Sequence, residues 1–203
     1  MSHDAAILTI GHSTHPIEVF VSLLQNHGVT AIADVRSTPA SRFNPQFNRD
    51  ALKRSLATIG IEYVFLGNEL GARSDDRSCY VDGRVQYDRL AKAPAYQLGI
   101  DRLDRGRRTH RIAVMCSERE PLDCHRAVLV SETFHTRGIP VEHILGDGTI
   151  ESHEASRHRL RQLHGLADAD LFHSTEELVT EALSRQEERI AYVDEDLRET
   201  VGD

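Results

Sequence analysis

The sequence predicts an α/β fold: one domain with a mostly parallel five-stranded sheet, helices on both of its faces and further helices at the C-terminus. Five short runs rich in β-branched residues alternate with segments whose apolar residues recur at helical spacing. The run at residues 29–35 is apolar almost throughout, which is typical of a strand buried on both faces. This alternation predicts right-handed βαβ units. At 203 residues, the chain is long enough for one such domain and a short appendage.

Apolar runs and turn residues place the elements of this domain along the chain. The expected strands are residues 7–10, 29–35, 61–66, 111–115 and 141–145. The expected helices are residues 17–27, 49–59, 87–103 with a break near Pro94, and a segment that Asp123 caps and that runs to Arg137. Residues 67–86, rich in Gly, Asp and Arg, are expected to form an irregular loop.

The C-terminal part is expected to be helical and acidic. Residues 152–164 have a helical pattern, and a capping box at Ser174 and Glu177 predicts a last helix to about Val193. The loose apolar stripe of this helix predicts that it packs on the body of the protein. Residues 166–203 carry 12 acidic and 3 basic side chains, so the net charge of −8 belongs to this segment. We therefore expect an α/β domain at 1–165 and an acidic helical extension at 166–203.

Composition narrows the class of protein. Three cysteines, an odd number, argue against a disulfide framework. The N-terminus lacks the features of a signal peptide, and no apolar run is long enough to span a membrane, so a cytoplasmic protein is expected. Of the 24 basic residues, 22 are arginines, which bind planar oxyanions well. A GC-rich genome explains such an excess more simply. Only the placement of particular arginines is therefore evidence for anion binding.

Polar residues gather where the expected parallel strands end, which is where ligands bind in open α/β sheets. In chain order they are His12 and Ser13, Asp34 and Arg36, Asn68 and Glu69, residues 116–118 (CSE), and Asp147. The loop after the second strand adds Arg42 among aromatic and amide side chains, which suits a planar or phosphorylated ligand, although a well-packed loop is an equal alternative.

The sharpest motif is the segment 116–126 (CSEREPLDCHR), which contains two of the three cysteines. With Asp123 as N-cap, Cys124, His125 and Arg126 would fill the first turn of a helix, where backbone N–H groups favour a thiolate or a bound anion. Three interpretations remain open. They are thiol catalysis with His125 or His12 as base, a zinc or iron site made by both cysteines and one histidine, and two cysteines that are simply buried.

Two familiar templates do not fit this segment. A phosphatase or rhodanese loop needs an arginine six positions after its cysteine, and Leu122 stands six positions after Cys116. A zinc deaminase needs a separate C-x-x-C pair, and the sequence has none.

Several motifs together resemble domain of unknown function 488. They are residues 9–13 (TIGHS), 34–36 (DVR), 41–47 (SRFNPQF), 66–73 (LGNELGAR), 116–126, 141–145 (VEHIL) and 153–154 (HE). The resemblance covers about residues 6–163 and implies a prokaryotic cytosolic α/β domain without a settled activity. Its paired cysteines hint at catalysis or metal binding. The stretch Gly71-Ala72-Arg73 departs from the double glycine expected there.

The leading hypothesis is an enzyme that acts on a phosphate-bearing or nucleotide-like ligand, as a thiol- or metal-dependent hydrolase or transferase. Its catalytic residues would be Cys116, Cys124, His12 and Glu118. Its ligand-binding residues would be Ser13, Asp34, Arg36, Arg42, His125 and Arg126. One alternative is a metal-binding protein or sensor that holds zinc or iron with Cys116, Cys124 and His125. Another is a nucleic-acid-associated module, although a neutral body and an acidic tail argue against strong non-specific binding to duplex DNA.

Overall fold

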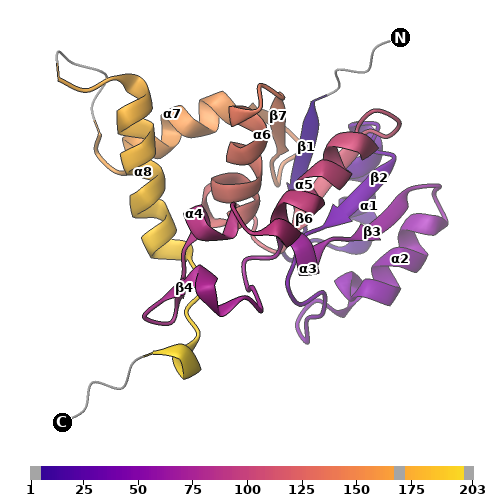
Figure 1. The fold of residues 1–203 in the computed structure, drawn as a ribbon. Helices are drawn as coiled ribbons and strands as arrows, with labels where there is room; N and C mark the ends of the chain where they lie inside the picture. Colours follow the sequence, from indigo (N-terminus) through magenta and orange to yellow (C-terminus); the bar gives the residue numbers. More distant parts are fainter. Residues whose placement is uncertain (1–5, 167–171, 199–203) are drawn as a thin grey trace.

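The computed structural model describes residues 6–166 and 172–198 and confirms the α/β class (Figure 1). Its central sheet has the strand order β3-β2-β6-β1-β7-β8. The bounds are β1 Ile7–Gly11, β2 Ala31–Asp34, β3 Glu62–Phe65, β6 Ile112–Cys116, β7 Val141–Ile144 and β8 Ile150–Ser152. The first five strands in the order are parallel, as predicted, and β8 pairs antiparallel with β7. The sequence predicts five strands; the sixth, β8, has three residues, too few to show a period-2 pattern.

Helices cover both faces of the sheet, because its strands send alternate side chains to opposite sides. Their bounds are α1 Ile17–Asn26, α2 Arg49–Ala57, α3 Gly67–Leu70, α4 Tyr87–Leu90, α5 Pro94–Gly106, α6 Glu132–Thr136, α7 His153–Leu163 and α8 Thr175–Ile190. In β6, Ala113 and Met115 lie in the core under α1 and α2, whereas Val114 and Cys116 lie in the core under α5 and α6. The predicted break near Pro94 separates α4 from α5.

The segment between β3 and α4 is more ordered than the sequence predicts. It contains α3, a 3-10 turn at Arg77–Cys79, and a two-stranded hairpin of β4 (Tyr80–Val81) and β5 (Arg84–Val85). These pieces have two to four residues each, so no hydrophobic period marks them in the sequence.

The expected cap at Asp123 is wrong. Glu120 caps a 3-10 turn at Pro121–Asp123, so Asp123 ends that turn. Cys124 follows in an extended conformation, and the helical segment then begins with a π-helical turn at Arg126–Ser131 that continues into α6. Cys124 takes the capping role, because its carbonyl accepts from the N–H groups of Ala127 and Val128 and its Sγ accepts from that of Arg126 at 3.4 Å. Pro121 starts the earlier turn, and the helical segment begins at Arg126, two residues later than the expected start at Cys124.

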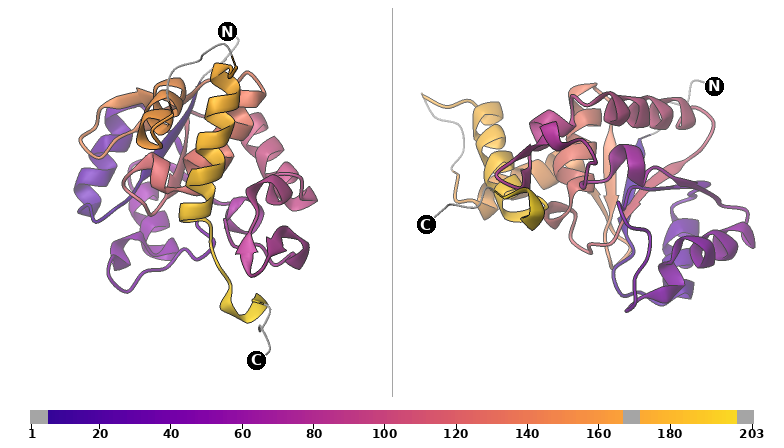
Figure 2. Two further views of the ribbon diagram at one scale, coloured as in Figure 1. Left: turned by 90° about the vertical axis from the view of Figure 1, so that its left-hand side faces the viewer. Right: turned by 60° about the horizontal axis from the view of Figure 1, so that its bottom comes forward.

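The last helix packs on the body, as its apolar stripe predicts. The capping box at Ser174 and Glu177 is present at the start of α8. Gln186 lies inside the contact and donates to the carbonyl of Leu122 at 2.8 Å. Figure 2 shows α8 along the outside of the molecule, with the chain after it running on beside the β4–β5 hairpin. Residues 167–171 and 199–203 of the predicted extension, and the first five residues, lie outside the described ranges.

Candidate functional site

A cavity of about 240 Å³ opens near the carboxyl ends of β2 and β6. Its wall combines residues that follow three of the strands with residues from α4, from the start of α6's helical segment and from the end of α8. The lining residues are Arg36, Ser37, Thr38, Ala72, Arg73, Tyr87, Cys116, Ser117, Glu118, Asp123, Cys124, His125, Ile190 and Tyr192. Of the ten predicted site residues, five line this cavity: Arg36, Cys116, Glu118, Cys124 and His125.

The two cysteines and His125 form a compact cluster at the base of the cavity. Nδ1 of His125 lies 3.9 Å from Sγ of Cys116 and 3.8 Å from Sγ of Cys124. The three potential ligand atoms lie within 4.8 Å of one another, and all three residues are buried. Cys116 is the last residue of β6, and Cys124 and His125 stand where the following helical segment begins. One strand–loop–helix connection therefore assembles the cluster.

The backbone of β2 fixes the orientation of the His125 ring. Nε2 of His125 lies 3.2 Å from the carbonyl oxygen of Val35, and a carbonyl only accepts hydrogen bonds. When the ring is neutral, its proton is therefore on Nε2 and the lone pair of Nδ1 is directed at the two sulfurs. Burial opposes protonation of Nδ1, but the charge of Cys124 and the hydrogen bond with it raise the pKa of His125 overall, so the ring beside the thiolate can also carry a positive charge. A hydrogen bond of this kind behind the ring is what metal-binding histidines usually have.

The cluster favours one thiolate and one thiol. Burial opposes ionisation of Cys124. The hydrogen bond with Cys116 and the charges of Arg126 and His125 nevertheless hold the pKa of Cys124 well below its usual value. The same hydrogen bond, together with burial, raises the pKa of Cys116. Partial desolvation and the negative charge on Cys124 raise the pKa of Glu118, whose side chain faces the cavity. A raised pKa brings a carboxyl group closer to the working pH, which favours a role in proton transfer.

Arg126 does not reach the cavity. Its side chain is fully buried, and its guanidinium donates to the carbonyl oxygens of Glu118 at 2.7 Å and Arg119 at 3.2 Å. Arg126 therefore holds the loop after β6 in place and adds positive charge behind Cys124. Sequence spacing places Arg126 correctly beside the cysteine, but the direction of its side chain depends on carbonyl groups that only the folded loop presents.

Arg36 lines the cavity but is already bound within the protein. It makes two side-chain hydrogen bonds to the carboxylate of Asp34, at 2.9 and 2.6 Å, and one to the carbonyl oxygen of Phe47 at 2.8 Å. Tyr63 donates to the same carboxylate at 2.6 Å. Asp34 is completely buried and lies outside the cavity wall, so it orients Arg36 rather than lining the site.

His12 lies behind Arg36, away from the cavity wall. Its ring stacks on Phe47 with 4.3 Å between ring centres, and Nδ1 donates to the carbonyl oxygen of Ser13 at 2.8 Å. Burial and the charge of Arg36 lower the pKa of His12 to about 4. Ser13 and Arg42 do not line the cavity either, and Arg42 is exposed. The structure thus separates these three predicted residues from the cysteine cluster.

Gly11 allows the loop after β6 to cross the end of β1. A Cβ at this position would lie 1.8 Å from the carbonyl oxygen of Glu118. We expect Gly11→Ala to lower the free energy of unfolding by roughly 1–3 kcal/mol, because the backbone of the loop must move. Urea unfolding measures this. The matched control is Gly106→Ala, where the new Cβ meets only the end of the Ile112 side chain; equal costs at the two positions would contradict the assignment.

Sequence reasoning missed the far wall of the cavity. Ser37 and Thr38 stand in the polar loop after the second strand but are not among the expected site residues. Tyr87, Ile190 and Tyr192 carry no recognisable signal, and residues 190 and 192 belong to the acidic extension. Arg73 is the exception, because it stands in one of the motifs that carry the family resemblance. Ile190 and Tyr192 reach the wall only because α8 packs against the segment that precedes α6.

Comparisons with known proteins agree with the architecture and leave the activity open. Within the described residues, none of the helices combines the length and apolarity required to cross a bilayer. Neither the curated proteins nor the solved structures contain a significant match to this chain. A family model, the domain of unknown function DUF488, matches residues 16–132. That match spans more than half of the chain, from α1 to the first residue of α6, and includes both cysteines of the cavity; the protein belongs to the DUF488 family.

Proposed function

We propose that this protein is a metal-dependent hydrolase, in which Cys116, Cys124 and His125 bind one zinc or iron ion and Glu118 carries protons. The observation that carries the proposal is the orientation of His125. Its Nε2 is bound to the Val35 carbonyl, so its Nδ1 lone pair faces two sulfurs that lie within 4.8 Å of it and of each other.

The spacing of the three ligand atoms suits a tetrahedral ion. With metal–sulfur and metal–nitrogen bonds of about 2.3 and 2.0–2.1 Å, the sulfur–nitrogen edge of a tetrahedron is about 3.6 Å. The corresponding distances here are 3.9 and 3.8 Å. Shifts of a few tenths of an ångström bring both sulfur–nitrogen distances to this value. The two sulfurs, which lie within 4.8 Å of each other, would approach to about 3.8 Å around a tetrahedral ion.

Three protein ligands beside a cavity favour a catalytic rather than a purely structural ion. Structural zinc sites are usually closed by four protein ligands, whereas catalytic sites keep one position for water or substrate. An ion held here would act as a Lewis acid and activate water. Glu118, at the same cavity wall, can take up and return a proton. Arg36 supports the cavity wall through its bonds to Asp34, and we assign it no part in the reaction.

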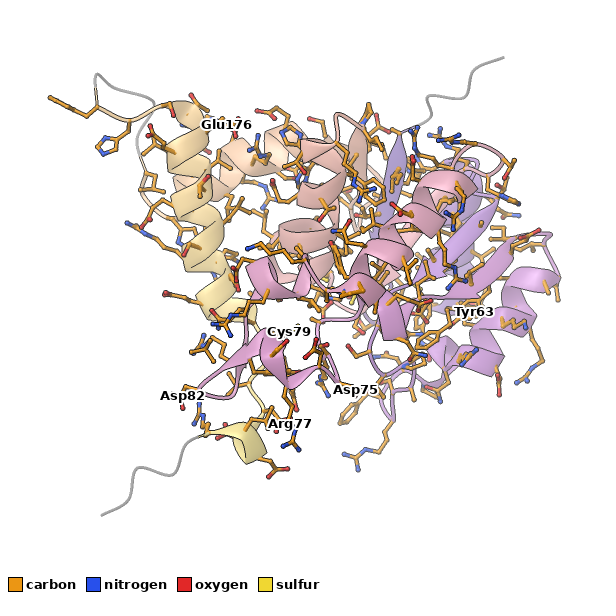
Figure 3. All side chains as sticks on the ribbon, in the orientation of Figure 1. Tyr63, Asp75, Arg77, Cys79, Asp82 and Glu176 are labelled. Carbon is orange, nitrogen blue, oxygen red and sulfur yellow. The ribbon has the colours of Figure 1, made fainter. Side chains whose placement is uncertain are left out.

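Elemental analysis of protein purified under reducing conditions tests the proposal. We expect about one zinc or iron ion per chain, reduced at least tenfold in Cys116→Ser and Cys124→Ser, because removal of one of three ligands weakens binding strongly. Cys79→Ser is the matched control. Cys79 is also buried, and Figure 3 shows it on the segment that leads into β4. It does not belong to the cluster of Cys116, Cys124 and His125. Substoichiometric metal that is unchanged in the serine variants would overturn the proposal.

Direct thiol catalysis by Cys124 is a second candidate, favoured by the N–H group of Arg126, which donates to its Sγ at 3.4 Å. For a metal-free protein, this candidate predicts that Cys124 reacts with iodoacetamide with an apparent pKa below about 8.5, the value of a free thiol. The rate at Cys124 in the native protein, followed against pH with the alkylated residue identified by mass spectrometry, measures it. An apparent pKa at or above that value removes this candidate.

A further inference from the structure

The mouth of the cavity is built from segments that are far apart in the chain. Arg73 follows α3, and Tyr192 follows α8; the guanidinium of Arg73 lies 4.4 Å from the centre of the Tyr192 ring. At the other end of the residue, the N–H group of Arg73 donates to Oγ of Ser37 at 3.0 Å. The arginine is therefore held at its backbone by the loop after β2 and at its guanidinium by the C-terminal segment.

The hairpin β4–β5 fixes the position of Tyr192. The N–H group of Val85 donates to the Tyr192 carbonyl at 3.0 Å, and that of Asp194 donates to the Gly83 carbonyl at 2.7 Å. Gly83 has a φ of +72°, and a Cβ there would lie 2.5 Å from the carbonyl oxygen of Asp194. The close approach of the two segments places the tyrosine ring at the cavity.

Arg73 is the lining arginine whose charge is not neutralised by a carboxylate. Arg36, the other one, is paired with Asp34 at 2.6 Å. Among the described residues, Arg73 makes a cation–π contact with Tyr192 and no ion pair, and its side chain is exposed at the cavity mouth. The flat ring orients the guanidinium while leaving its N–H groups available, and these bind carboxylate or phosphate in bidentate fashion.

We propose that Arg73 is the anion-binding residue of the cavity and that the substrate is a compact molecule carrying an oxyanion, phosphate or carboxylate. The proposal rests on the proposed function, because it takes the cysteine–histidine cluster as the reacting end of the site. The hydroxyl groups of Ser37 and Thr38 line the same cavity and can donate further hydrogen bonds to an oxyanion. The volume of about 240 Å³ is below the roughly 300–1,000 Å³ of cavities that hold drug-sized ligands. A compact substrate follows from that size.

Alkylation with two small reagents of different charge tests this role. Iodoacetate and iodoacetamide both form a bond between the cysteine sulfur and their CH₂ carbon with loss of iodide, but only iodoacetate carries a carboxylate. We expect the ratio of the iodoacetate rate to the iodoacetamide rate at Cys116 and Cys124 to fall about tenfold in Arg73→Gln, because the attraction to one nearby charge is lost. Arg73→Lys should retain most of the preference. Arg42→Gln, which removes an exposed arginine outside the cavity, should leave it unchanged.

A second readout does not depend on cysteine reactivity. Millimolar inorganic phosphate or acetate should raise the Tm of the native protein and raise it less in Arg73→Gln, since a ligand that binds the folded state stabilises it. A larger effect of phosphate indicates a phosphate-bearing substrate, and a larger effect of acetate a carboxylate. Equal charge selectivity and equal Tm shifts in the native protein and Arg73→Gln would overturn the proposal.

The metal content of Arg73→Gln separates this proposal from the proposed function. The metal content and the preference for anions are both measured on protein as purified and again after treatment with a chelator. If the native protein carries a full metal complement but shows no preference for anions, only the proposed role of Arg73 is refuted. If the native protein prefers anions but binds no metal, only the proposed metal site is refuted.

Discussion

Replacement of Asp34 by alanine is expected to lower the free energy of unfolding by about 3–5 kcal/mol, because it leaves a buried arginine without its counter-charge. The Asp34 carboxylate is fully buried and accepts hydrogen bonds from the backbone and side chain of Arg36 and from the hydroxyl group of Tyr63. Arg36 is itself only 4% exposed, so water cannot replace the lost partner without opening the end of β2. The Arg36 side chain should then leave its position in the cavity wall.

Urea unfolding at neutral pH measures this loss, and Asp88→Ala provides the matched control. Asp88 pairs with Lys92 at 3.4 Å, but both side chains are more than two-thirds exposed. Such a pair contributes roughly 0–1 kcal/mol. Asp34→Asn keeps one acceptor oxygen but loses the charge. Its loss of unfolding free energy should fall between those of Asp34→Ala and Asp88→Ala. A cost of Asp34→Ala no greater than that of Asp88→Ala would show that the buried ion pair does not stabilise this edge of the sheet.

Acidification is expected to destabilise the protein by about 2 kcal/mol between pH 7 and pH 5, and by about 3 kcal/mol at pH 4, through His12 alone. Burial, and the nearby charge of Arg36, lower its pKa from 6.5 to about 4. The unfolded chain therefore binds a proton that the folded chain does not. This proton binding does not reduce the free energy of unfolding at pH values well above 6.5. The reduction grows as the pH falls from 6.5 toward 4. His143, whose pKa is lowered by burial and by His153, acts in the same direction.

The share of His12 is obtained by comparison with His12→Gln, whose unfolding free energy should depend less steeply on pH over this range. The slope difference removes contributions common to both proteins, including that of His143. His110→Gln is the matched control, because His110 lies near the surface, where it faces Glu62. Parallel curves for the native protein and His12→Gln would contradict a neutral, buried His12 and the hydrogen bond from Arg36 to its Nε2 at 3.2 Å.

Local patterns in the sequence were sufficient for the main elements. The β-branched runs and the helical stripes predict five parallel strands and most of the helices, since burial of one face or both imposes a period on neighbouring residues. The same patterns placed Cys116, Cys124 and His125 at the carboxyl edge of the sheet, and the structure brings them into one cluster. Strands of two or three residues, such as β8 and the two strands of the β4–β5 hairpin, are too short to impose such a period.

The sequence by itself therefore determined the α/β class, the edge of the sheet where polar residues gather, and the pairing of two cysteines with a histidine. The tertiary structure alone decided which arginines line the cavity, and which of these has no carboxylate partner among the described residues. Arg126 turns inward to two carbonyl groups, Arg36 is bound to Asp34, Arg42 lies at the surface, and Arg73 meets Tyr192. The physical reason is range. A helix or strand is specified by neighbours a few residues away, whereas the direction of a long charged side chain depends on partners such as Tyr192, more than a hundred residues from Arg73, that only the folded chain brings near.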